Sequence, residues 1–221
     1  MFTMIRFFDI TFSLVVLVLL SPIIISIAVW NLITGENNVF YFQKRVGRNG
    51  QVFSIIKFAT MLKDSPNMGA RGFTETNDPR LLPLGGFLRK TKLNELPQLI
   101  NVLKGEMSLV GFRPLTLESY STAIKLASEN TYDTKPGITS PASIYFRNEE
   151  TLLAQIDSTL RQKYYDEIIL RKKVILDDWW KTNKSTFNYF AVLTLTAFCL
   201  LFPNRPLPIE LLTVTADSEF N

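Results

Sequence analysis

Residues 10–35 read ITFSLVVLVLLSPIIISIAVWNLITG and carry no charged side chain. A straight helix of this length would reach about 39 Å at 1.5 Å per residue, more than the roughly 30 Å hydrocarbon core of a bilayer. The run is too long for a cleaved signal peptide, and no small-residue cleavage site follows it. This stretch decides the fold class, because it predicts that the chain begins with a membrane-associated helix.

Ser21 and Pro22 interrupt this run near its middle. Pro22 has no N–H and its ring clashes with the carbonyl of Val18, which predicts a kink, and Ser21 can donate a hydrogen bond to a freed carbonyl. Each arm would be only about 18 Å long. Basic residues flank both ends, as is typical of a cytoplasmic side. Two arrangements fit: a kinked spanning helix, and a re-entrant helix that returns to the face it entered.

The composition limits the chemistry available to the chain. It has 221 residues, a net charge of +4 and no histidine, and Cys199 is its single cysteine. Imidazole catalysis, His-ligated zinc and an intrachain disulfide are therefore excluded. Catalysis would have to use carboxylates, Lys, Tyr, Ser or Thr, or a hard cation with oxygen ligands. The positive charge suits an anionic partner. Nucleic acid is not expected as that partner, because no motif for binding it is present.

Two further stretches predict secondary structure. Residues 39–58 indicate a β-hairpin, in which the turn signal Asn49-Gly50 separates two aromatic and β-branched runs. Its basic side chains form either a solvated face or a contact with phosphate groups. Residues 63–80 are polar and rich in turn formers, as in a long loop or lid. Residues 185–204 are uncharged and predict an apolar helix in or near a membrane interface.

The stretch KTKLNELPQLINVLKGEMSLVGFRP, residues 90–114, contains the candidate site. Asn94 is placed to cap a helix with Pro97 in its first turn and Gly105 at its end. In this structural interpretation Glu95 only complements the helix dipole. Alternatively, the two residues are the remains of a reacting pair. Arg113 is suited to bidentate phosphate binding, although an ordinary surface arginine fits the pattern as well.

Four motifs occur in order within residues 3–148: RFFD before the broken apolar run, VFYFQKRVGRNGQVFSIIKFATM, GGFLRKTKLNELPQLINVLKGEMSLVGFRP and KPGITSPASI. Together they resemble the bacterial sugar transferase family, the monotopic phosphoglycosyl transferases that act on polyprenyl phosphate. The resemblance implies transfer of a sugar-1-phosphate from a UDP-sugar to undecaprenyl phosphate, with release of UMP. It also implies a location at the cytoplasmic face of the bacterial inner membrane, Mg²⁺ as cofactor, and a re-entrant helix broken at Ser21-Pro22.

In this family an Asp-Glu pair reacts at the head of the ELPQL helix. The Asp attacks the β-phosphorus of the sugar nucleotide, and the Glu helps to hold the metal. Glu95 matches the Glu, but Asn94 stands at the position of the Asp, and an amide is a poor nucleophile. Three explanations are open. The chain is a substituted or naturally inactive member; another carboxylate, Glu95 or Glu106, reacts; or the phosphosugar passes directly to the lipid phosphate.

The predicted fold is α+β and mainly helical, with a small β-hairpin and amphipathic interfacial helices. It divides into a re-entrant helix (residues 1–36), a catalytic domain at the cytoplasmic face (37–184), and an apolar interfacial helix with a C-terminal tail (185–221). The predicted catalytic residues are Asn94 and Glu95, with Glu95 also as metal ligand. The predicted phosphate and substrate ligands are Lys57, Arg80, Arg89, Arg113 and Arg147. The rival interpretation is a catalytically silent scaffold that binds lipid phosphate. The sugar, the glycan (O-antigen, capsule or exopolysaccharide) and a homodimer are left open.

Overall fold

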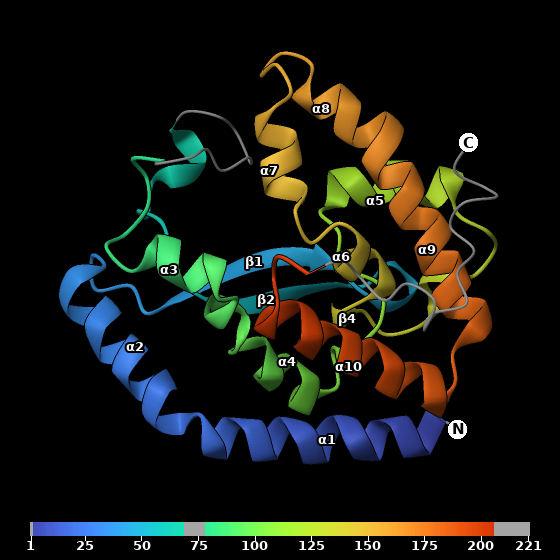
Figure 1. The fold of residues 1–221 in the computed structure, drawn as a ribbon, viewed down its shortest axis with the longest axis horizontal. Helices are drawn as coiled ribbons and strands as arrows, with labels where there is room; N and C mark the ends of the chain where they lie inside the picture. Colours follow the sequence, from blue (N-terminus) through green and yellow to red (C-terminus); the bar gives the residue numbers. More distant parts are fainter. Residues whose placement is uncertain (1, 69–77, 206–221) are drawn as a thin grey trace.

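The computed structural model describes residues 2–68 and 78–205, and Figure 1 shows how their elements are arranged. The helices are α1 (Phe2–Leu19), α2 (Ser21–Thr34), α3 (Gly85–Lys90), α4 (Gln98–Lys104), α5 (Leu117–Leu126), α6 (Pro141–Tyr145), α7 (Glu149–Ala154), α8 (Arg161–Tyr164), α9 (Leu170–Asn183) and α10 (Thr186–Leu201). The strands are β1 (Phe40–Val46), β2 (Val52–Phe58), β3 (Ser108–Val110) and β4 (Gly137–Thr139). Short 3₁₀ turns are η1 (Arg48–Gly50), η2 (Ser65–Asn67), η3 (Leu93–Glu95) and η4 (Thr131–Asp133), and η5 (Tyr165–Ile169) is a π-helical turn. The mainly helical fold with a small hairpin is confirmed.

The predicted kink separates α1 from α2, which meet at an angle of 64° (Figure 1). Ser21 Oγ donates a hydrogen bond to the carbonyl of Val18 at 2.8 Å, as expected. Pro22 lies in the first turn of α2, where its missing N–H leaves no hydrogen bond unmade. Within residues 2–68 and 78–205, no single helix is both long and apolar enough to cross a bilayer. By length and composition alone, the bent α1–α2 pair meets that criterion.

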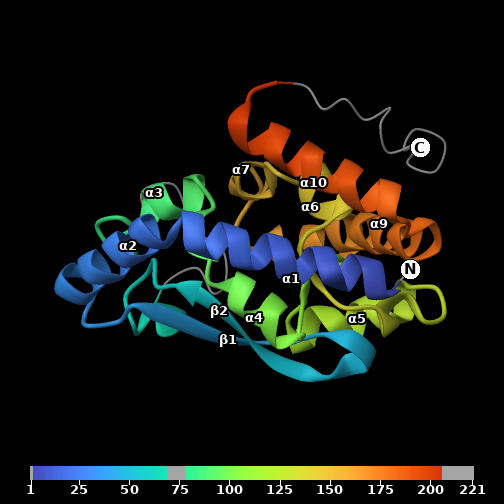
Figure 2. The same ribbon diagram turned by 90° about the horizontal axis from the view of Figure 1, so that it is seen from below.

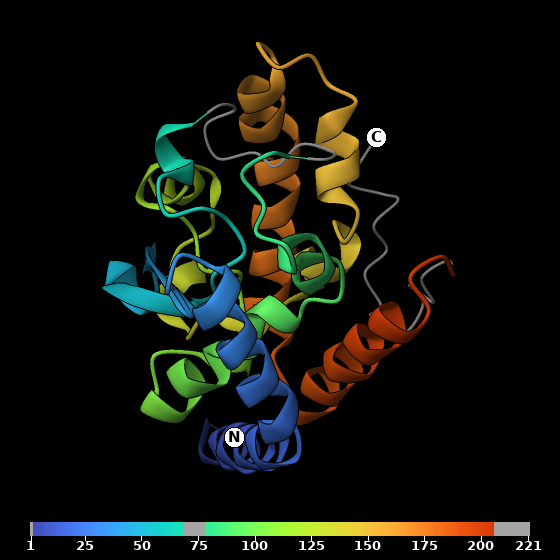
Figure 3. The ribbon, with the colours of Figure 1, turned by 90° about the vertical axis from the view of Figure 1, so that its left-hand side faces the viewer.

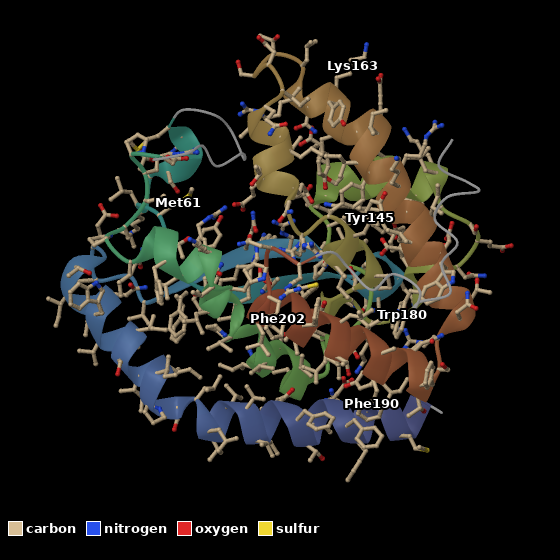
Figure 4. The ribbon with its side chains drawn as sticks, in the orientation of Figure 1. Met61, Tyr145, Lys163, Trp180, Phe190 and Phe202 are labelled. Carbon is tan, nitrogen blue, oxygen red and sulfur yellow. The ribbon has the colours of Figure 1, made fainter. Side chains whose placement is uncertain are left out.

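A buried carboxylate ties α1 to the rest of the molecule. Asp9 Oδ1 accepts hydrogen bonds from Ser108 Oγ at 3.0 Å, Leu109 N at 2.9 Å and Tyr189 Oη at 2.9 Å. Figure 2 shows α1 lying across α4, with α10 on one side. Phe190 of α10 packs against Phe8 with ring centroids 5.0 Å apart, in the space between the two helices (Figure 4). The Asp of the RFFD motif is therefore a structural anchor.

The hairpin pairs β1 with β2 in antiparallel register from Phe40↔Phe58 to Val46↔Val52. Asn49 and Gly50 both have positive φ, 54° and 75°. The N–H of Gln51 bonds to the carbonyl of Arg48 at 3.1 Å. The predicted Asn-Gly turn is therefore confirmed.

Asn101 of α4 fastens the hairpin to the helical layer. Its Oδ1 accepts from the N–H of Ile56 at 3.0 Å, and its Nδ2 donates to the carbonyl of Ser54 at 2.8 Å. From the other side, Asn31 of α2 donates to the carbonyl of Ala59 at 2.8 Å. Because buried polar side chains satisfy the backbone of β2, the strand is fixed in position against α4.

A second, parallel pair of strands joins β3 to β4 through Ser108↔Gly137 and Val110↔Thr139. Two glycines let these segments approach. A Cβ on Gly137 would lie 2.1 Å from the nitrogen of Gly111, and a Cβ on Gly111 would lie 2.3 Å from the carbonyl oxygen of Lys135. Real Cβ atoms essentially never come so close to other atoms. The glycines thus fix the path of the chain that leads from β3 to Arg113.

The C-terminal part of the described chain is helical, as predicted. The run α8–η5–α9 leads to Ser185, whose Oγ caps α10 by accepting from the N–H of Asn188 at 3.1 Å. Figure 3 shows α10 turning away from α9. Tyr189, Val192 and Leu195 bury one side of α10 in the core. Part of the predicted loop (69–77) and nearly all of the predicted tail (206–221) lie outside the described residues.

Candidate active site

Three segments bring Lys57, Glu95 and Arg113 together. Glu95 Oε1 accepts hydrogen bonds from Lys57 Nζ at 3.2 Å and from Arg113 Nη2 at 3.0 Å. Lys57 comes from β2, Glu95 from η3 and Arg113 from the loop after β3. The side chains of Lys57 and Glu95 are 16% and 12% exposed, whereas that of Arg113 is 39% exposed. Arg113 is therefore the member of this cluster that a ligand in solution reaches first.

The electrostatics of the cluster favour an anionic ligand. Burial alone would raise the pKa of Glu95, but Arg113 and Lys57 outweigh burial and hold that pKa far below its usual range. Burial lowers the pKa of Lys57 to about 8 despite the attraction of Glu95. Glu95 raises the pKa of Arg113. One carboxylate thus lies among several cations, and the positive excess is suited to phosphate oxygens.

Asn94 does not cap α4, so the structural interpretation of this residue is wrong. The N–H of Glu95 bonds to the carbonyl of Lys92 at 3.0 Å, which makes residues 93–95 a 3₁₀ turn. Pro97 then occupies the cap position of α4 without any side-chain hydrogen bond. Asn94 is 7% exposed, and its Oδ1 has no hydrogen-bond partner within the described part of the chain. Leaving such an atom unpaired costs about 1–3 kcal/mol.

Three of the predicted ligands are engaged elsewhere. Arg80 is buried and pairs with Asp78, with 2.6 Å between Nη2 and Oδ2. Arg89 Nη2 donates to Glu150 Oε1 at 2.8 Å. Arg147 Nη2 donates to the carbonyl of Arg205 at 2.8 Å. Each contact supports a loop or a helix end, and a role in phosphate binding stays a prediction for all three.

Arg45 belongs to the same electrostatic cluster and was not predicted as a site residue. Burial first, and Arg113 second, lower its pKa to about 10, and its Nη1 donates to the carbonyl of Pro114 at 3.3 Å. The strand register places Tyr41 opposite Lys57 and Arg45 opposite Phe53. Because side chains alternate along a strand, Arg45 and Lys57 share one side of the hairpin. That alternation was the signal that could have identified Arg45.

The residues of this cluster suit a magnesium ion that is bound partly by the protein and partly by the phosphates of a bound substrate. Among the described residues, no three His, Cys, Asp or Glu side chains converge as a metal site. Mg²⁺ commonly binds through one or two carboxylates together with substrate phosphates and water. Both cationic partners of Glu95 contact Oε1, which leaves Oε2 as the oxygen for such a metal. The arrangement fits a metal ion bound jointly by Glu95 and substrate phosphates, and not one whose ligands all come from the protein.

Comparison with known proteins identifies the family. The model of the bacterial sugar transferase family matches residues 2–203. The chain belongs to this family. Among curated sugar transferases, the undecaprenyl-phosphate galactose phosphotransferase of Salmonella typhimurium is 34% identical over 214 residues, covering 89% of this chain and 40% of that protein. The uncharacterized sugar transferase EpsL of Bacillus subtilis is 36% identical over 192 residues, covering 86% and 84%. The chain spans about two fifths of the Salmonella protein and most of EpsL.

Proposed function

We propose that this bacterial sugar transferase moves a sugar-1-phosphate from a UDP-sugar to undecaprenyl phosphate and releases UMP. The observation that carries the proposal is the Glu95 carboxylate held between Lys57 and Arg113, directly after Asn94. A diphosphate is the chemical group that such a positive cluster recognises. The undecaprenyl-phosphate glucose phosphotransferase of Komagataeibacter xylinus, 39% identical over 109 residues, gives further support.

The geometry of the cluster supports the following residue roles. Arg113 and Lys57 would hold the diphosphate, and Glu95 would bind Mg²⁺, which supplies neutralisation of phosphate charge. Glu106 is not adjacent to this cluster: it lies beyond the other end of α4 and accepts from Asn101 Nδ2 at 2.7 Å. We therefore propose direct transfer. An oxygen of the lipid phosphate attacks the β-phosphorus, the bond to the α-phosphate oxygen breaks, and UMP leaves with the electron pair. The amide of Asn94 would position a phosphate oxygen.

The proposed location is the cytoplasmic face of the inner membrane, with α1 and α2 as a re-entrant pair. The support is a set of exposed apolar side chains on both helices, namely Phe7, Leu14, Val18, Leu19, Ile25, Val29 and Ile33. Neither helix alone is both long and apolar enough to span a bilayer, and an apolar surface this extensive is typical of contact with lipid. The lipid phosphate would then reach the cluster from the bilayer.

The second candidate function is a catalytically silent scaffold that binds lipid phosphate, and Asn94 is the observation that favours it. Both functions are tested by measuring UMP release from a panel of UDP-sugars with undecaprenyl phosphate and Mg²⁺. The chain and its Asn94→Asp variant are compared in parallel. We expect the chain to release UMP only when undecaprenyl phosphate is present. We expect Asn94→Asp to add a burst of about one UMP per enzyme without the lipid, because a carboxylate can form the covalent intermediate.

The outcomes separate the candidates. UMP release by the unaltered chain that requires undecaprenyl phosphate supports direct transfer, whereas a burst without the lipid supports a carboxylate nucleophile. No release by the unaltered chain while Asn94→Asp is active supports the silent scaffold. If both proteins are inactive with every UDP-sugar, the transferase proposal is wrong for this chain.

The pKa of Lys57 predicts an upper pH limit for transfer. Because burial lowers this pKa to about 8, the ammonium is charged below that pH and loses its charge above it. We expect kcat/KM to fall about tenfold per pH unit above pH 8. In the Lys57→Arg variant the guanidinium stays charged, so the decline should be absent up to about pH 10. An identical decline in both proteins would assign the limit to another group.

A further inference from the structure

A second basic cavity lies away from the cluster around Glu95. Its volume is about 260 Å³, and its lining includes Arg6, Asp9, Arg48, Ser108, Lys135 and Lys184. These residues come from the start of α1, the hairpin turn, β3, the segment before β4 and the α9–α10 connection. Figures 1 and 2 show the start of α1 and that connection at one end of the molecule. Lys57 pairs with Tyr41 near the open end of the hairpin, whereas Arg48 lies in its turn.

Cationic side chains outnumber carboxylates in the lining of the cavity. Four of the six residues named are cations, and Asp9 is the carboxylate among them. Asp9 Oδ1 is already occupied by three donors, including Ser108 Oγ. Burial first, and Arg6 second, lower the pKa of Lys135. Burial lowers the pKa of Lys184 although Asp9 opposes this shift. An anion in the cavity would oppose that effect.

Lys135 is the residue that indicates a ligand. A Cβ on Gly105 would lie 3.4 Å from Lys135 Nζ and 3.6 Å from Arg6 Nη2, so both cations lie against the turn that ends α4. The two terminal nitrogens of Arg6 donate to the carbonyls of Val102 and Leu103, at 2.6 Å and 3.0 Å. By contrast, Lys135 Nζ has no hydrogen bond or ion pair within the described part of the chain. A phosphate group would supply the missing partner, because charge-assisted hydrogen bonds from an ammonium to phosphate oxygens are among the strongest in proteins.

We propose that this cavity binds a phosphate group, and that Lys135 is its principal ligand. A volume of about 260 Å³ holds one phosphate group and several waters, since a water occupies about 30 Å³. The group would belong to an anionic phospholipid or to a soluble phosphate compound. The exposed Met4 and Phe7 on the same end of α1 bring a lipid head group within reach. The inference rests on this cavity and not on the proposed transfer reaction.

The test measures how fast individual lysines react with an acylating reagent, followed by peptide mass spectrometry of the full chain in nanodiscs. Three preparations are compared: the phosphate-free lipid digalactosyldiacylglycerol alone, the same lipid with phosphatidylglycerol, and the same lipid with added inorganic phosphate. Sodium chloride matches the ionic strength throughout, because salt screens exposed charges. Lys125, exposed on α5, is the reference lysine in each preparation.

We expect labelling of Lys135 to fall at least threefold relative to Lys125 in one or both phosphate-containing preparations. Protection by phosphatidylglycerol assigns the phosphate to a lipid head group, and protection by inorganic phosphate alone assigns it to a soluble ligand. The Arg48→Gln variant, altered at an exposed turn, should lose most of this protection, whereas Lys125→Gln should keep it. Equal labelling of Lys135 in all three preparations would overturn the proposal. Protection that Arg48→Gln leaves unchanged would also overturn it.

Discussion

Glu95→Gln is expected to lower kcat/KM for sugar-phosphate transfer by at least about a hundredfold. The amide removes the one carboxylate that Lys57 and Arg113 share, at 3.2 Å and 3.0 Å. It also removes the proposed metal ligand. Without that carboxylate the ammonium of Lys57 loses its proton more easily, because burial already lowers its pKa to about 8. The measurement is steady-state UMP release in nanodiscs, with circular dichroism to follow folding.

A matched control comes from an exposed ion pair. Glu167 lies 3.9 Å from Lys163, and both side chains are more than 60% exposed. Such pairs contribute little to stability, so Glu167→Gln should retain full activity and an unchanged melting temperature. Full activity of Glu95→Gln would show that the cluster is structural and that the reacting groups lie elsewhere. A loss of helical structure in Glu95→Gln would instead assign the effect to folding.

Gly137→Ala is expected to destabilise the protein by about 3 kcal/mol or more, among the larger effects of a single substitution. The new Cβ would lie 2.1 Å from the nitrogen of Gly111 and 2.4 Å from the carbonyl oxygen of Thr139. Both are backbone atoms, so β4 would have to change its own conformation and also move away from Gly111, which follows β3. Because the loop after β3 carries Arg113, we also expect activity to disappear. Thermal melting and size-exclusion chromatography of the purified variant measure the effect.

Gly86→Ala is the control for this substitution. The nearest heavy atom to a Cβ on Gly86 is Leu81 Cδ1 at 4.0 Å, and Gly86 lies within α3. Alanine favours a helix over glycine, so the melting temperature should stay the same or rise slightly. If Gly137→Ala melted like Gly86→Ala, the close approach of β3 and β4 would not limit stability.

Features encoded by neighbouring residues were predictable from the sequence. The kink needs only Pro22 and the hydroxyl of Ser21, and the hairpin turn needs only Asn49 and Gly50. The prediction that Asn94 caps a helix was wrong, although a cap also depends only on neighbouring residues. The chain instead forms a 3₁₀ turn that delays the start of α4 until Gln98.

Features that join distant segments were not predictable. The pairing of β3 with β4 joins three-residue strands almost thirty positions apart, which is too short for a periodic signal. Residues 90–114 alone identified Glu95 and Arg113 as candidate site residues. Their contact with Lys57, however, depends on how Asn101 fixes β2 against α4. By contrast, Arg80 and Asp78 lie only two positions apart, so their pairing is a local feature that was not predicted.

The three hydrogen bonds to Asp9 have a consequence for the order of folding. Their donors lie 99, 100 and 180 positions further along the chain. α1 is synthesised before the segments that carry these donors, and its carboxylate finds its last partner only when Tyr189 has been made. Contacts of such long sequence separation close late and slow the acquisition of the native state. α1 is therefore fixed in place only after these later segments have been made.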